Sequence, residues 1–117
     1  MGLGRLEIYQ ISLDLSSAVW DIYLQLPKPL RFSIGDQVLR SIDSIGANIA
    51  EGYGRYHYKD SMKFYYNARG SLWESKHWFY LLLKRDLISQ KLFEENIALL
   101  DALGKKLNGF IRTLNQK

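Results

Sequence analysis

The chain has 117 residues, a formal net charge of +4 and no cysteine. The lack of cysteine excludes disulfides, cysteine-ligated zinc and thiol catalysis, and it suits a reducing cytoplasm, where we expect the protein to act. Hydrophobic residues make up 47% of the sequence and charged residues 24%, which is typical of a soluble globular protein. Because no apolar run reaches about 18 residues, no membrane contact is expected, and residues 1–117 are predicted to form one domain.

The first hydrophobic pattern predicts a helix over residues 5–26. Apolar residues recur at spacings of three and four from Ile8 to Leu26. Pro27 and Pro29 are expected to end this helix, because proline lacks a backbone N–H and disfavours the helical conformation in the residue before it.

A second helix is predicted to begin at Ser33 or Ile34 and to end at Glu51. Ser33 and Asp36 resemble a capping box, with aspartate in place of the usual glutamate or glutamine. The apolar residues are β-branched, which would suit strands, but their spacing is helical. They are Ile34, Val38, Ile42, Ile45 and Ile49.

Gly46 lies inside this second helix, and Gly52 and Gly54 follow its predicted end. Gly46 costs about 1 kcal/mol relative to alanine inside a helix, so it indicates the close approach of a neighbouring helix. Gly52 and Gly54 are predicted to adopt left-handed conformations that end the helix and turn the chain. A phosphate-binding loop is not expected here, since it requires a preceding strand and a Gly-Lys-Ser/Thr ending.

The third predicted helix covers residues 58–85 and has two distinct faces at about 100° per residue. The inward face is expected to hold Phe64, Ala68, Ser71, Leu72, Ser75, Phe79 and Leu82. The outward face mixes charged and aromatic side chains, which a merely solvated face would not. It is expected to hold Lys59, Met62, Lys63, Tyr66, Arg69, Trp73, Lys76, His77, Tyr80 and Lys84.

A short loop at residues 86–88 is followed by Ser89, a candidate N-cap for the last helix. The apolar positions of that helix are Phe93, Ile97, Leu100, Leu103, Leu107, Ile111 and Leu114. Four amphipathic helices with short connections predict an all-α fold, an antiparallel up-down-up-down four-helix bundle.

Positive charge is concentrated in the third helix and the segment that leads into it. Residues 55–85 contain seven basic and two acidic side chains, a net charge of +5. Lys59 and Lys63 repel each other across one helical turn, and a phosphate between them would relieve that repulsion. The alternative is a solvated lysine face. The predicted nucleic-acid contacts are Arg55, Lys59, Lys63, Arg69, Lys76, Lys84 and Arg85.

Tyr66, Trp73 and Tyr80 are seven residues apart and form one heptad stripe. Such a stripe is more typical of a packing surface between subunits than of a platform for stacking bases, although Tyr66 and Tyr80 remain lesser stacking candidates. We therefore predict an oligomer interface made of Met62, Tyr66, Trp73 and Tyr80.

Catalytic and metal-binding constellations are not evident. Glu74 and His77 have the spacing of a di-iron ligand pair, but such a site needs a second pair and two further carboxylates. The other histidine, His57, lies in the glycine-rich break, and no nucleophile accompanies either histidine. No catalytic residues, metal site or cofactor are predicted, and the protein is not expected to be an enzyme.

Two blocks of sequence resemble a known family. The first is SIDSIGANIAEGYGR at residues 41–55, and the second is FYYNARGSLWE at residues 64–74. Together they resemble the signatures of the bacterial four-helix-bundle proteins related to the 23S rRNA intervening-sequence proteins. Ser61, where the family often has an aromatic residue, and Ser75, where it often has leucine, depart from the pattern.

The resemblance implies a four-helix bundle that assembles as a homopentamer. The family is also similar to the accessory variability determinant of diversity-generating retroelements, which is a basic pentamer that binds nucleic acid and a reverse transcriptase. We expect a non-enzymatic oligomer that binds RNA or DNA through its phosphate backbone. The alternative is a protein–protein adaptor that docks a partner such as a reverse transcriptase.

Overall fold

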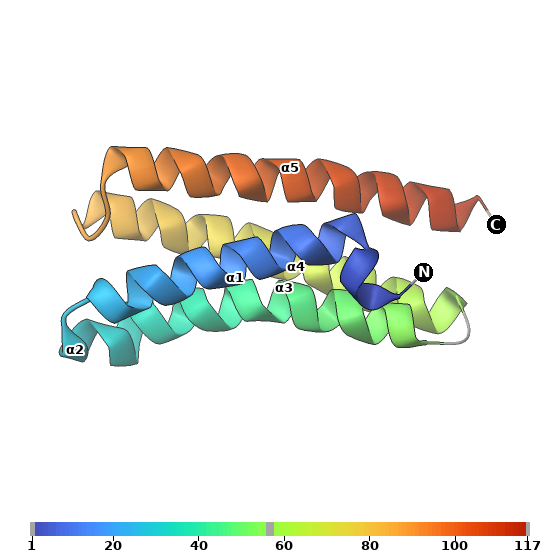
Figure 1. Ribbon diagram of the computed structural model, residues 1–117, viewed down its shortest axis with the longest axis horizontal. Coiled ribbons are helices and arrows are strands. Elements are labelled where there is room, and N and C mark those ends of the chain that lie inside the picture. Colours follow the sequence, from blue (N-terminus) through green and yellow to red (C-terminus); the bar gives the residue numbers. More distant parts are fainter. Residues whose placement is uncertain (1, 56–57, 117) are drawn as a thin grey trace.

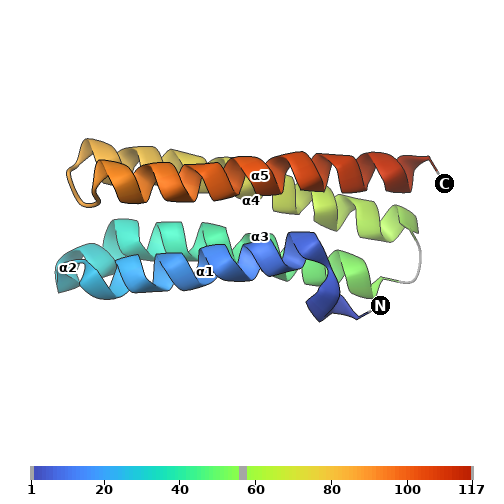
Figure 2. The ribbon, with the colours of Figure 1, turned by 45° about the horizontal axis from the view of Figure 1, so that its top comes forward.

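The computed structural model describes residues 2–55 and 58–116, and these residues form helices and no strand (Figure 1). Each long helix runs antiparallel to the one before it, which confirms the predicted all-α four-helix bundle (Figure 2). In chain order the elements are the 3₁₀ turn η1 (Leu3–Arg5), α1 (Glu7–Gln25), α2 (Lys28–Leu30), the π-helical turn η2 (Arg31–Gly35), α3 (Asp36–Gly54), α4 (Tyr58–Lys84) and α5 (Gln90–Asn115).

The bundle is elongated, with extents of 46 × 23 × 21 Å. Helices α1 and α4 each pack against both α3 and α5, so α1 lies diagonally across the bundle from α4. None of the helices in the described part of the chain combines the length and apolar character that a bilayer crossing requires.

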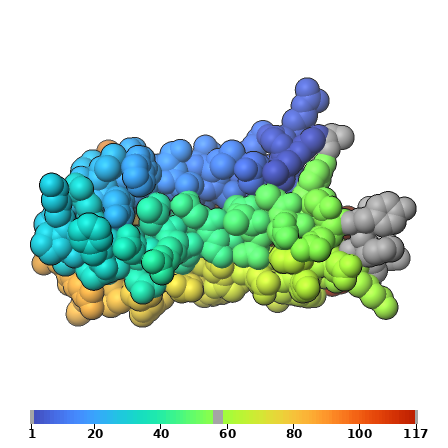
Figure 3. All heavy atoms as spheres, turned by 90° about the horizontal axis from the view of Figure 1, so that it is seen from below, coloured from blue at the N-terminus to red at the C-terminus, as the bar shows by residue number. Residues whose placement is uncertain are grey.

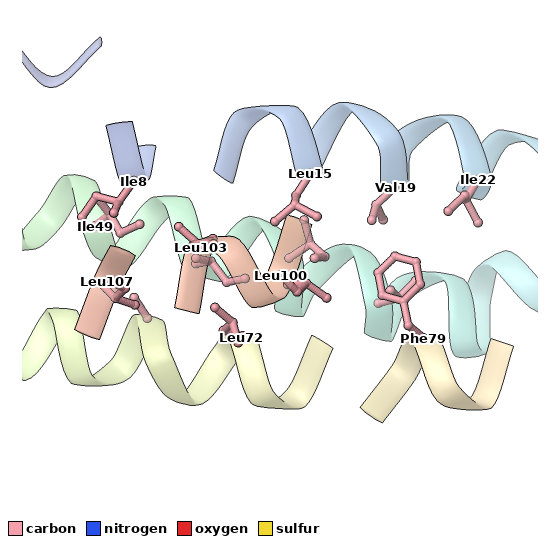
Figure 4. Close-up of a cluster of buried hydrophobic side chains, with 14 of the residues drawn as sticks. Ile8, Leu15, Val19, Ile22, Ile49, Leu72, Phe79, Leu100, Leu103 and Leu107 are labelled. Carbon is pink, nitrogen blue, oxygen red and sulfur yellow. The ribbon is translucent and has the colours of Figure 1, made fainter. Parts of the chain in front are cut away.

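The core follows the apolar stripes predicted from the sequence (Figure 4). Side chains from all four long helices meet along the bundle axis, and burying each large one contributes about 1.5–3 kcal/mol. The fully enclosed ones include Leu15, Val19, Ile42, Ile45, Ile49, Leu72, Phe79, Leu82, Leu100, Leu103 and Leu107.

The second helix begins earlier than predicted. Pro27 is extended and Pro29 lies in the first turn of α2, so the two prolines begin a new helix as well as ending α1. The π-helical turn η2 then joins α2 to α3 without a break. The predicted capping box is therefore wrong: the Ser33 hydroxyl donates to the carbonyl oxygen of Leu30 at 3.2 Å.

The same helix also ends later than predicted. It continues to Gly54, and no described glycine has a positive φ, so the left-handed conformations predicted at Gly52 and Gly54 are wrong. A methyl group at Gly52 would lie 2.9 Å from Cζ of the buried Tyr65. Gly46 does have the predicted close neighbour, since a methyl group there would lie 2.9 Å from Oγ of Ser12.

The connection between α4 and α5 contains the one described non-glycine residue with positive φ, Asp86, at 57°. Aspartate tolerates this left-handed conformation better than most residues. Ser89 is the N-cap of α5 as predicted, because its Oγ accepts a hydrogen bond from the N–H of Leu92 at 3.1 Å.

Short polar side chains line the contact between α3 and α4, which we call the serine seam; its members are Ser41, Ser44, Asn48, Ser71 and Ser75. The Ser75 and Ser41 hydroxyls are 2.9 Å apart, and those of Ser71 and Ser44 are 3.0 Å apart. Asn48 Nδ2 donates to the carbonyl oxygen and hydroxyl of Ser44. Ser75, which departs from the family pattern, is thus fully buried but hydrogen-bonded.

Candidate nucleic-acid interface

Helix α4 runs along most of the bundle, and the predicted nucleic-acid contacts are distributed over its whole length. Its 27 residues span about 40 Å at 1.5 Å per residue. Arg55, Lys59 and Lys63 lie at the end where α3 leads into α4, whereas Lys84 and Arg85 lie at the opposite end. The basic side chains therefore form a row rather than one compact site.

The cations near the start of α4 gather around one aromatic ring. The guanidinium of Arg55 is 4.7 Å from the centroid of the half-buried Phe64 ring, and Nζ of Lys63 is 5.1 Å from it. Arg55 also makes an ion pair with Glu51, at 2.8 Å, but both side chains are about half exposed. Such a pair contributes only about 0.2–1 kcal/mol, so it can yield to a phosphate.

The two basic residues in the middle of α4 are turned toward α5. Arg69 Nη1 donates to Oδ1 of Asn108 at 3.2 Å. Nζ of Lys76 is 2.7 Å from Oδ1 of Asp101 and 4.3 Å from the centroid of the Trp73 ring, and the side chain is 17% exposed. The structure thus gives Lys76 a role in holding α4 against α5.

At the far end of α4, Arg85 lies beside a pocket of about 440 Å³ between α3 and α4. Arg40 of α3 and the aromatic rings of Phe32 and Trp78 also line this pocket. Phe32 is 77% exposed because the wide turn η2 directs it outward. Sequence reasoning missed Arg40 and Phe32, although Arg40 lies off the apolar stripe of its helix.

Three of the four residues predicted to form an oligomer interface are exposed. Tyr66, Trp73 and Tyr80 are 42%, 63% and 59% exposed. Met62 is 7% exposed and belongs to the core, so its predicted outward position is wrong. The first turns of α4 bury a wider arc than its middle, because the neighbouring Tyr65 packs inward, edge-on against a ring of α5.

A second row of exposed apolar side chains, on α1, was not predicted. Leu13, Trp20 and Leu24 are 47%, 48% and 47% exposed. Their positions are seven and four residues apart and lie off the stripe that faces the core. This spacing was the available signal for a second apolar surface.

The pair Glu74 and His77 does not lie in a metal-binding arrangement. Glu74 Oε2 accepts a hydrogen bond from Nε1 of Trp78 at 2.9 Å, and the His77 ring packs edge-on against the same tryptophan. Among the described residues, no three His, Cys, Asp or Glu side chains are grouped to hold a metal ion. His57 lies outside the described residues.

These features define an antiparallel four-helix bundle with basic and aromatic side chains along one long helix. A sequence model of the 23S rRNA-intervening sequence protein family matches residues 4–109, which is most of the chain. The chain belongs to this family.

A solved relative has the same fold. It is a Bacteroides thetaiotaomicron protein described as a protein with unknown function from the S23 ribosomal protein family. The two chains share 26% sequence identity with a TM-score of 0.83, and the match covers 89% of this chain and 97% of the other. No protein with a curated description matches this chain.

Proposed function

We propose that this protein is a non-enzymatic, oligomeric nucleic-acid-binding bundle that acts in the cytoplasm and contacts phosphates through the basic row of α4. The observation that carries the proposal is a charge difference between the two halves of the bundle. Helices α4 and α5 contain nine basic and five acidic side chains, a net charge of +4. Helices α1 and α3 contain one basic and six acidic side chains, a net charge of −5.

This difference matters because a net charge of +4 over the whole chain understates the field at one surface. Phosphates would be attracted to the positive half and repelled by the negative half. Membership of a family named for an intervening sequence of 23S rRNA agrees with such a ligand.

The basic residues should contribute unequally. Lys59, Lys63 and the pair Lys84 and Arg85 are exposed, and no ion pair joins any of these four to another described residue. Arg55 and Arg69 already have polar partners and should contribute less, and Lys76 should contribute least because Asp101 neutralises it. Contacts to the phosphate backbone alone would give little sequence preference, with either RNA or DNA.

Assembly is the second part of the proposal. The exposed stripe of Tyr66, Trp73 and Tyr80 would be an association liability on a monomer. We propose that it is covered in a homo-oligomer, and the family resemblance favours a homopentamer. Several copies of the basic row would then act together on one nucleic acid.

The test is a binding titration with structured RNA and with duplex DNA at about 50 mM and about 200 mM salt, where the phosphate contribution differs by orders of magnitude. A variant carrying Lys59→Glu, Lys63→Glu, Lys84→Glu and Arg85→Glu should lose binding and its salt dependence. The matched control reverses Arg5, Lys28, Lys91 and Arg112, which are exposed and lie outside the row. Equal loss in both variants would reduce the effect to net charge, and no binding by the unmodified protein would refute the proposal.

An adaptor that docks a protein such as a reverse transcriptase is the second candidate. The observation that favours it is the number of large hydrophobic side chains exposed on α1 and α4. A protein partner that stays bound after nuclease treatment and depends on Trp20 or Trp73 would support the adaptor. A partner lost on nuclease treatment would instead have been held through nucleic acid.

A further inference from the structure

The bundle has two opposite long faces of different character. One is formed by α1 and α3, which lie side by side in Figure 3, and the other by α4 and α5. Of the eight exposed large hydrophobic side chains among the described residues, three lie on α1 and three on α4. Each face therefore carries one apolar row, Leu13, Trp20 and Leu24 on the first and Tyr66, Trp73 and Tyr80 on the second.

Each face also has a hollow beside its apolar row. On the α1/α3 face, a hollow of about 230 Å³ is lined by the small residues Gly46, Ala47 and Ala50, with Leu13 at its side. On the α4/α5 face, a hollow of about 290 Å³ is lined by Gly104 and lies next to Trp73. A bulky side chain from the apolar row of one face can thus fit into the hollow on the opposite face of a second molecule.

The charges of the two faces are complementary. Asp43 is the charged residue lining the hollow on the α1/α3 face. The hollow on the α4/α5 face is lined by three basic residues and one acidic residue, namely Arg69, Lys76, Lys105 and Asp101. The same relation holds for the whole helices, with net charges of −5 and +4 on the two halves.

Like charges disfavour pairing either face with itself, whereas opposite charges favour pairing one face with the other. We propose that the α1/α3 face of one copy docks head-to-tail on the α4/α5 face of a second copy, with Trp73 entering the hollow over Gly46 and Ala47. This rests on the assembly in the proposed function and specifies its interface. The phosphate contacts Lys59, Lys63, Lys84 and Arg85 line neither hollow, so the interface leaves them to the nucleic acid. A two-fold dimer would instead place the same patch on both sides of the interface.

Two variants each block one face. Ala47→Arg puts a bulky cation at an exposed alanine of the α1/α3 hollow, and Trp73→Glu removes the aromatic side chain and adds negative charge on the other face. Ala98→Arg is the matched control, since Ala98 is an exposed alanine of α5 that lines neither hollow. Circular dichroism of each variant checks that the helices remain.

The experiment measures mass by light scattering without nucleic acid. We expect the unmodified protein and Ala98→Arg to assemble, and each blocked variant alone to be a monomer of 13.6 kDa. Mixing the two blocked variants should restore one intact interface, and so should give a species of twice the chain mass that goes no further.

Assembly of Ala47→Arg alone, or no dimer in the mixture, would overturn the head-to-tail interface while leaving nucleic-acid binding untouched. A monomeric unmodified protein would overturn the interface together with the assembly proposed above.

Discussion

Two of the regions where polar side chains are buried in the bundle differ in their hydrogen bonding. In the serine seam, hydroxyls on α3 and α4 lie within hydrogen-bond distance of one another, as between Ser41 and Ser75. On α5, Asn96 is 2% exposed, and its Nδ2 donates to the carbonyl oxygen of Leu92 in the preceding turn. Its Oδ1 has no hydrogen-bond partner among the described residues.

The difference shows that burying a polar group is tolerated best where the facing helix also offers one. Short side chains on both sides of the seam bring α3 and α4 close enough for their hydroxyls to meet. Asn96 lies between Phe93 and Leu100 in the apolar stripe of α5, so its own helix supplies the one partner observed. An unpaired buried acceptor costs about 1–3 kcal/mol, whereas a paired group contributes about 1 kcal/mol.

Gly52→Leu should have the largest effect on the packing of α3 against α4, of which the serine seam is a part. A side chain there would collide with the ring of Tyr65, which is buried and packs edge-on against Phe110. We expect a loss of about 3 kcal/mol in the free energy of unfolding, at the upper end of overpacking effects. The measurement is urea unfolding followed by circular dichroism. Gly54→Leu is the control, because a methyl group at Gly54 would have no neighbour within 4 Å; equal losses would contradict this account.

Alkaline pH should weaken the same end of the bundle. Burial raises the pKa of Tyr65 from its ordinary value of 10.0 to about 12, and the nearby Tyr53 adds to the rise. Because the pKa of Tyr65 is higher in the folded state than in the unfolded chain, its neutral side chain contributes full stability at any pH below the unfolded pKa. This contribution is lost as the pH rises from about 10 to about 12. The loss is of the order of 2 kcal/mol. Tyr65→Phe should reduce the difference in unfolding free energy between pH 9 and pH 11.5. If the difference were unchanged in this variant, the alkaline loss of stability would come from other groups.

Ser75→Ala should have a smaller effect, about 1 kcal/mol, because it removes one hydrogen-bonding hydroxyl without changing the packing much. A double-mutant cycle with Ser41→Ala isolates the interaction between the two helices. We expect a coupling energy of about 0.5–1 kcal/mol from urea unfolding of the four proteins. Additive losses would mean that each serine is satisfied within its own helix, by the carbonyl oxygens of Val38 and Ser71.

Asn96→Leu should have the smallest effect, and its sign is the informative part. The substitution removes the unpaired acceptor and its intrahelical hydrogen bond together, so stability should stay the same or rise by up to about 1 kcal/mol. Thermal unfolding of this variant beside Ser75→Leu makes the comparison direct, since leucine in the seam would separate α3 from α4. A loss above about 2 kcal/mol for Asn96→Leu would show that the amide has a partner that stabilises it.

The four long helices could be predicted because their apolar residues repeat with the helical period throughout. The ends of α3 could not, since Pro29 suits the first turn of a helix as well as the stretch after one, and Gly52 is held by a contact with the next helix. Gly52 looked like a turn residue, but Tyr65 of the next helix fills the space that a side chain would need.

In the candidate site, too, the features encoded within one helix could be predicted, whereas those set by contacts between helices could not. The exposure of Tyr66, Trp73 and Tyr80 follows from heptad spacing within one helix, and this part of the prediction is confirmed. The pairing of Lys76 with Asp101 depends on how α5 lies against α4, which no pattern within α4 encodes. Met62 lies 18 residues before the exposed Tyr80, at the same angle on an ideal helix, and it was misplaced because the first turns of α4 bury a wider arc than its middle.

The π-helical turn η2 acts like a one-residue insertion in a helix that otherwise runs from Lys28 to Gly54. Removing one residue from it would leave a continuous α-helix and would rotate α2 by about 100° around the axis of α3. That rotation would carry Arg31 away from the carbonyl oxygens of Leu24 and Leu26, to which its guanidinium donates at the end of α1. The number of residues in η2 thus sets the direction around the axis of α3 from which the chain arrives after α1.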